Sequence, residues 1–195
     1  MLALGNLGGW ERSRSCLAIR TPFTRRCNAC QMQALEPTNS IERLFIPAAA
    51  TFLPAREVEI IRLNNGALRY SWQSPCSALE CLNAHILESE IMLSTKISHT
   101  HIEGWRFGQG ELNEDQRAVR IAVGAIKEIL EIMDGDLVFT KDYDSAGNEL
   151  TSSGMSPRNV WLYPPSDMSS HKSHTANGVT ERAWDWFGEV TRPKA

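Results

Sequence analysis

The chain has 195 residues, of which 42% are hydrophobic and 22% are charged. These values are typical of a globular domain, because a disordered chain would hold fewer aliphatic residues. The longest apolar runs are much shorter than the roughly 20 residues that cross a bilayer. The first residues also lack the apolar stretch of a secretory signal. We therefore expect one domain in the cytoplasm, with no membrane contact.

The net charge of −3 is unevenly distributed along the chain. Residues 1–31 carry five arginines against one glutamate, a charge of +4, which leaves −7 for the remainder. We expect a basic disordered leader over 1–31, one domain over 32–190 and a tail over 191–195. The leader is an organelle-targeting segment, a disordered tail or an extension ahead of an internal start at Met32. An acidic domain lacks the basic face that binds phosphates, so we expect no nucleic-acid partner.

The first half of the domain reads mainly as strands. Residues 39–45 predict a short helix that Pro47 ends. Residues 57–63 and 67–72 alternate on either side of an Asn-Asn-Gly turn signal, which predicts a β-hairpin. A short helical connection is expected over 77–84. The longest alternating segment, 86–102, predicts a strand with one face toward a core.

The strongest helix prediction covers residues 113–133. Asn113 is the expected N-cap, with Gln116 at the reciprocal position of a capping box. Gly135 is expected to end the helix. Apolar residues recur with the spacing of an amphipathic helix that packs on a sheet. They are Val119, Ala122, Val123, Ile126, Ile129, Leu130 and Met133.

The remaining residues complete the expected fold. Residues 136–143 predict a strand that returns through Leu150 after a turn, and 159–163 predict a last short strand. Residues 180–190 predict a short helix whose Trp184 and Phe187 pack on the sheet. The pattern indicates an α+β fold, with a mostly antiparallel sheet, one long amphipathic helix at about 113–133 packed on it, and a short C-terminal helix.

The candidate metal ligands are His99, His101 and Glu103. Their spacing on a strand places all three side chains on one face, about 6 to 7 Å apart. Imidazole and carboxylate groups suit zinc, iron or manganese, and a further histidine, at 85, 171 or 174, would complete the site. The simpler interpretation is that they are solvated residues at a strand end. We expect no other cofactor.

Other chemical motifs are incomplete. Cys27 and Cys30 form one Cys-x-x-Cys pair without the second pair of a zinc ribbon. The Gly-rich loop at 108–110 precedes carboxylates that would repel phosphate. The segment from Asp142 to Ser153 lacks the glutamate that ends a calcium loop. The sequence therefore assigns no catalytic residue.

Two functions remain. The preferred one is a protein-binding domain, of the immunity or adaptor type, that docks on a basic partner through carboxylates and an aromatic anchor. The residues expected to contact that partner are Glu111, Glu114, Asp115, Asp142, Asp144 and Trp186. The alternative is a metal-dependent enzyme or small-molecule binder that uses the His-x-His-x-Glu strand, in which case those residues should line a pocket.

Overall fold

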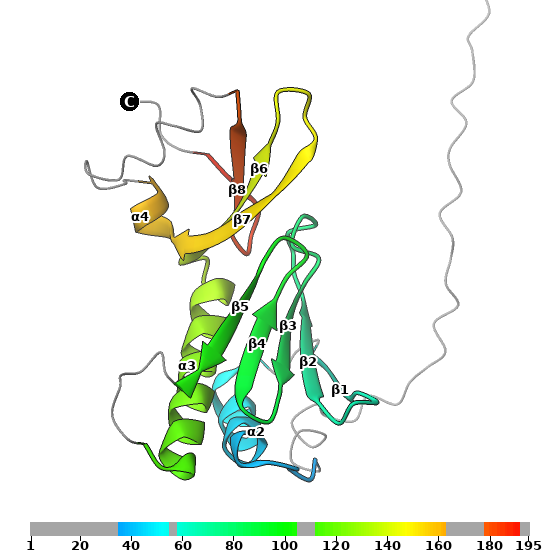
Figure 1. The fold of residues 1–195 in the computed structure, drawn as a ribbon, viewed down its shortest axis with the longest axis vertical. Coiled ribbons are helices and arrows are strands. Elements are labelled where there is room, and N and C mark those ends of the chain that lie inside the picture. The colour runs from blue at the N-terminus through cyan, green and yellow to red at the C-terminus, as the bar shows by residue number, and fades with distance from the viewer. Residues whose placement is uncertain (1–34, 55–57, 105–111, 163–177, 192–195) are drawn as a thin grey trace, which may run out of the picture.

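The computed structural model describes residues 35–54, 58–104, 112–162 and 178–191, and the structural statements below concern these residues. They form an α+β fold with two antiparallel sheets (Figure 1). The helices are α2 (Ser40–Phe52), α3 (Glu114–Met133) and α4 (Arg158–Leu162). The strands are β1 (Val58–Arg62), β2 (Leu68–Gln73), β3 (Cys81–Ile86), β4 (Glu90–Ser94), β5 (His99–Glu103), β6 (Leu137–Tyr143), β7 (Glu149–Pro157), β8 (Thr180–Trp184) and β9 (Glu189–Val190). The predicted leader over 1–31 lies outside the described residues.

The first sheet is a five-stranded meander in the order β1-β2-β3-β4-β5. The predicted first hairpin is confirmed, with Gly66 in the left-handed conformation that its turn requires (φ 85°). The prediction of a helix over 77–84 is wrong, because residues 77–79 form a turn and residues 81–84 belong to β3. The single strand expected over 86–102 is a hairpin, since β4 and β5 pair with each other.

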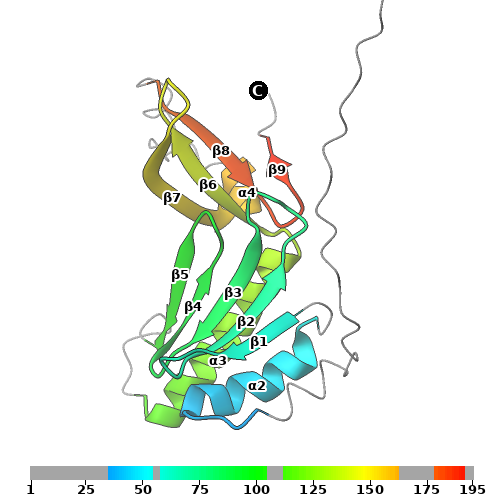
Figure 2. The same cartoon turned by 90° about the vertical axis from the view of Figure 1, so that its right-hand side faces the viewer.

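Helices α2 and α3 cover one face of this sheet (Figure 2). The predicted capping box of α3 is confirmed, because Asn113 accepts from the Gln116 backbone and Gln116 accepts from the Asn113 backbone. Helix α2 extends through Pro47 instead of ending before it. The buried face of α3 differs from the predicted stripe, since Val119 and Val123 are 45% and 61% exposed. The buried residues are Ala118, Ile121, Ala122, Ala125, Ile126, Ile129 and Ile132.

The second sheet lies beyond the strand ends of the first and has the order β7-β6-β8-β9 (Figure 1). The predicted strand at 136–143 and its return are confirmed. Two other predictions are wrong: residues 159–163 begin in helix α4 rather than a strand, and residues 180–190 contain a β-hairpin rather than a helix. One side of the sheet packs on α4 through Val138 and Trp161, whereas Phe139 and Trp184 join the main core.

A buried ion pair fastens β1 to α2. The Glu42 side chain is completely buried, and Arg62 donates to both of its carboxylate oxygens, at 2.6 and 2.9 Å. Burial raises the pKa of Glu42, but hydrogen bonds from Arg62 and the Thr38 backbone, with the Arg62 charge, outweigh that effect. The pKa of Glu42 therefore lies below its ordinary value, so the carboxylate stays ionised at neutral pH.

Tyr70 is fully buried beside this pair, and its hydroxyl has no hydrogen-bond partner among the described residues. Burial, followed by the Glu42 charge, raises the pKa of Tyr70 above its ordinary value. An unpaired buried hydroxyl costs about 1 to 3 kcal/mol. We therefore expect Tyr70→Phe to raise the free energy of unfolding by about 1 kcal/mol in urea titrations. A loss of stability would show that the hydroxyl has a partner.

In the part of the chain that the structure describes, no helix is both long enough and apolar enough to cross a bilayer.

Candidate functional site

A cleft of about 620 Å³ lies between the two sheets. One wall consists of the loops that follow β2 and β4, which contribute residues 75–78 and 96–97. The other wall is the second sheet, which contributes side chains from β6, β7, β8 and the β8–β9 hairpin. Small-molecule sites in proteins commonly have volumes of about 300 to 1,000 Å³. The cleft is therefore large enough to hold a ligand or a partner's side chains.

Two cations stand side by side in the second-sheet wall. Lys141 on β6 and Arg182 on β8 are direct cross-strand partners, and both line the cleft. Like charges that face each other across neighbouring strands are destabilising. The register between β6 and β7 shifts between Lys141 and Tyr143, whereas the pairing of β6 with β8 is continuous there. Lys141 and Arg182 therefore lie next to each other in a wall that also holds the carboxylates of Glu149 and Glu189.

The two cations differ in how well they are neutralised. Arg182 donates two hydrogen bonds of 3.0 Å to Glu189, and this pairing raises the pKa of Arg182 and lowers that of Glu189. The Lys141 ammonium lies 3.9 Å from a carboxylate oxygen of Glu149, which is too long for a hydrogen bond. The Lys141 side chain is only 18% exposed. Lys141 is therefore the cation with the most unused capacity to bind an anion.

Aromatic rings surround the Arg182 guanidinium. Its centre lies 5.2 Å from the Trp184 ring and 5.8 Å from the Tyr143 ring, within the range of cation–π attraction. Phe187 lines the cleft with 63% of its surface exposed, and its ring rests against Gly135. Phe187 therefore offers a partner apolar area next to the cations.

The opposite wall contributes a third cation. Lys96 follows β4 and forms a 2.6 Å ion pair with Glu80 that is more than half exposed at both ends. The hydrogen bond that Lys96 donates to the Glu80 carboxylate raises the pKa of Lys96. Exposed pairs of this kind contribute little to stability, so Lys96 is able to exchange Glu80 for another carboxylate at small cost. Cations therefore face the cleft from both sheets.

The acidic residues that the sequence assigned to a partner surface do not form one surface. Glu114 and Asp115 begin α3, whereas Asp144 lies at the β6–β7 turn at the other end of the molecule (Figure 1). Asp115 already pairs with Arg43, and Asp144 accepts hydrogen bonds from its own turn, which lower its pKa. Asp142 is buried, at 9% exposed. Glu111 lies outside the described residues.

The aromatic anchor also differs from the prediction. Trp186 is 8% exposed and belongs to the main core, so it is not an exposed anchor. Trp184 is buried as expected, whereas Phe187, which was expected to pack on the sheet, is exposed. The hairpin explains this exchange: Asp185 accepts from the backbones of Phe187 and Gly188, so the chain turns there and Phe187 projects outward.

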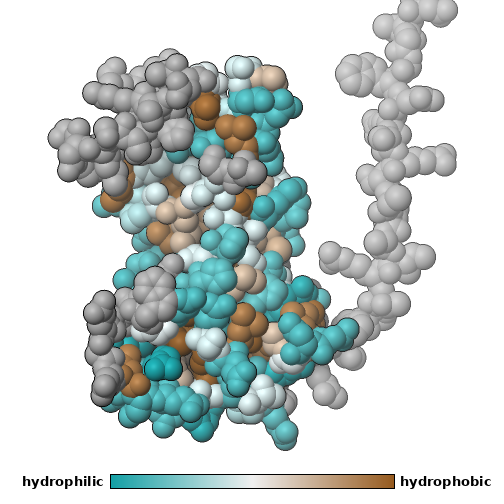
Figure 3. Space-filling model, viewed as in Figure 1, coloured by the Kyte–Doolittle hydropathy of each residue, from teal (hydrophilic) through white to brown (hydrophobic). Residues whose placement is uncertain are grey.

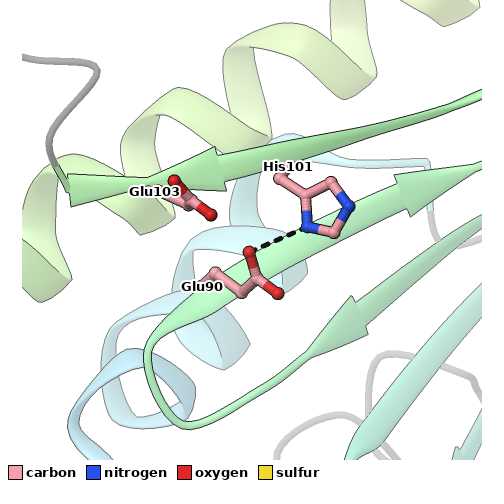
Figure 4. A group of neighbouring side chains, drawn as sticks. All are labelled: Glu90, His101 and Glu103. Carbon is pink, nitrogen blue, oxygen red and sulfur yellow. Dashed lines mark hydrogen bonds and ion pairs between the residues drawn. The ribbon is translucent and has the colours of Figure 1, made fainter.

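The candidate metal ligands lie on the open face of the first sheet, and none of them lines the cleft. The structure groups His101 and Glu103 with Glu90, which the sequence did not suggest, and the ligand atoms of these three residues lie within 4.8 Å of one another (Figure 4). His99 stands beside them, with its ring 5.3 Å from that of His101. His85 lies on the same face, where burial and the Arg69 charge lower its pKa.

Comparisons with models of protein families, with curated proteins and with solved structures give no match to this chain.

Proposed function

We propose that this chain is a protein-binding domain whose cleft receives an acidic segment of a partner protein. The observation that carries the proposal is the cross-strand pair Lys141 and Arg182 in the cleft wall, faced by Lys96 from the other sheet. A carboxylate that binds between two neighbouring cations relieves their repulsion and accepts charge-assisted hydrogen bonds from them. We therefore propose an acidic partner, whereas the acidic composition of the chain favoured a basic one.

The partner segment should combine carboxylates with an apolar side chain. Phe187 at the cleft and the rings around Arg182 offer apolar contact next to the cations. Aromatic residues and arginine are enriched where binding energy concentrates in protein interfaces. Glu149 and Glu189 form the competing pairs, so the partner's carboxylate must replace or share them. This competition favours a segment with more than one carboxylate, because two carboxylates form more ion pairs in the cleft than one does.

The alternative of a metal-dependent enzyme has less support. His101 and Glu103 lie on an open sheet face, and the residues that line the 620 Å³ cleft include neither of them. A catalytic site needs a concave surface that holds a substrate against the reacting groups. The cleft is therefore separate from His101 and Glu103, whereas His99 lines a neighbouring pocket that shares Lys96 and Ile97 with the cleft.

Selection of random peptides displayed on phage against the full chain tests the proposal. We expect the enriched peptides to contain at least two carboxylates next to an aromatic or aliphatic residue. Lys141→Glu should weaken their binding by about 10- to 100-fold, because a hydrogen bond to a charged group contributes about 1.5 to 3 kcal/mol. Isothermal titration calorimetry measures this loss.

Lys127→Glu is the matched control. Lys127 lies on α3 outside the cleft, is 74% exposed and forms a 3.5 Å pair with Glu131 four residues later. The charge change equals that of Lys141→Glu, so a general electrostatic effect would act in both variants. Affinity should stay within about twofold of wild type in the control. Enrichment of basic peptides, or equal losses in the two variants, would contradict an acidic partner in the cleft.

A further inference from the structure

A second pair of like charges occurs on the open face of the first sheet. Glu90 on β4 and Glu103 on β5 are direct cross-strand partners. Their neighbours Ile91 and Ile102 are buried against the helices, so both glutamates project from the opposite face, as Figure 4 shows. Carboxylates that face each other in this way repel. Among the described residues, neither glutamate pairs with a lysine or an arginine.

The imidazole of His101 completes the group. Its Nδ1 lies 2.9 Å from Oε2 of Glu90, and its side chain is 42% exposed, against 18% for Glu90. A nitrogen and two carboxylate oxygens within 4.8 Å form a mixed donor set, which suits zinc better than the all-oxygen sites of magnesium or calcium. Ligands of one zinc ion lie up to about 4 Å apart, so modest side-chain rotation closes the group.

We infer that Glu90, His101 and Glu103 bind a divalent metal ion of the zinc type. Zinc is the ion used in the test below. The ion would neutralise the two opposed carboxylates, and water would complete its coordination on the solvent side. The site joins β4 to β5, the strand at the edge of the sheet. A bound ion therefore stabilises this edge, because ligands that bind only the folded state favour it. Figure 3, which views the molecule from this side, shows hydrophilic residues over much of the surface.

Zinc titration of the metal-free full chain by calorimetry tests the inference. Cys27, Cys30 and other histidines are alternative zinc ligands. The test therefore compares the zinc stoichiometry and affinity of each variant with those of wild type. We expect His101→Ala to lose one equivalent of zinc, or to bind it about 100-fold more weakly, since even outer-shell changes cost roughly 10- to 100-fold. Equal stoichiometry and affinity in wild type and His101→Ala would overturn the site.

Glu59→Gln is the matched control. Glu59 projects from the same face at the opposite edge strand, β1, and is 65% exposed. The Glu59→Gln variant should bind zinc as wild type does, whereas Glu103→Gln should not. His99→Ala separates this group from the one that the sequence suggested: it should retain the zinc. Loss of the ion in His99→Ala would overturn the three-residue assignment.

The thermal midpoint gives an independent readout. With a chelator present, Glu103→Gln should melt at a higher temperature than wild type, because one of the two opposed charges is gone. With zinc present the order should reverse, because wild type alone gains from the ion. An unchanged order in the two conditions would contradict the site.

Discussion

Arg62→Ala is expected to lower the free energy of unfolding by about 3 to 5 kcal/mol, because it leaves the Glu42 carboxylate buried without its counter-ion. Glu42 is completely buried, and without Arg62 it keeps hydrogen bonds from the backbone and side chain of Thr38. Removal of one partner from a buried pair costs far more than removal of an exposed pair. Urea unfolding at pH 7 measures the difference.

Arg43→Ala is the control for this prediction. Arg43 lies on α2, next to Glu42, and pairs with Asp115 at 2.9 Å. The side chains of this pair are 61% and 78% exposed. We expect a change of at most about 0.5 to 1 kcal/mol, as for other exposed pairs. Similar losses in Arg43→Ala and Arg62→Ala would show that burial does not determine the strength of the Glu42 pair.

Acid should affect wild type and Arg62→Ala in opposite directions. In wild type the pKa of Glu42 is lowered, so its contribution is present above the ordinary pKa of 4.5 and is lost as the pH falls below it. In the variant, burial without Arg62 raises the pKa of Glu42. The cost of burying an unpaired charge therefore disappears as the carboxylate becomes protonated. The stability difference between the two proteins should therefore narrow in acid. A constant difference from pH 7 to pH 3 would contradict this account.

Ile129→Ala is expected to destabilise the fold by about 2 to 5 kcal/mol, whereas Val123→Ala should change stability by less than about 0.5 kcal/mol. Ile129 is completely buried between α3 and the first sheet, and Val123 is 61% exposed on the same helix. Both belonged to the stripe that periodicity predicted. Equal losses in urea unfolding would show that α3 packs with a different face.

The misplaced stripe has a physical cause. Ala118 and Ala125 occupy core positions of α3, where it packs closely against α2 and the sheet. Their small side chains add little to a hydrophobic pattern, whereas Val119 and Val123 add more although they face solvent. Periodicity therefore located the helix, and the capping-box pattern located its N-cap, but part of the predicted buried face points to solvent. Close helix packing favours small residues that hydrophobicity alone undervalues.

Local turn chemistry explains which strands were predictable. The Asn64-Asn65-Gly66 turn sits between short alternating runs, so the first hairpin follows from sequence alone. The second hairpin of the C-terminal region was missed, although Asp185 and Gly188 stand at the first and fourth positions of its turn. The clustered aromatic residues suggested a helix, whereas pairing with β6, some 40 residues earlier, makes the segment a strand.

The two candidate sites depend on pairings between distant segments. Lys141 and Arg182 meet only because β6 pairs with β8, and no spacing rule connects them in sequence. Glu90 was missed because the hairpin that places it opposite Glu103 was predicted as one strand. Side-chain alternation did place His101 and Glu103 on one face. A single sequence thus indicates which residues share a strand face but not which strands meet.

The most direct test of the cleft is an NMR titration of the ¹⁵N-labelled full chain with the tightest acidic peptide from the display selection. We predict that the largest chemical-shift changes occur at Lys96, Lys141, Arg182 and Phe187 and at the Trp184 indole, and that Lys141→Glu removes them at the same peptide concentration. Changes centred on the first turn of α3 or on the open sheet face, with these cleft residues unaffected, would contradict the proposed function.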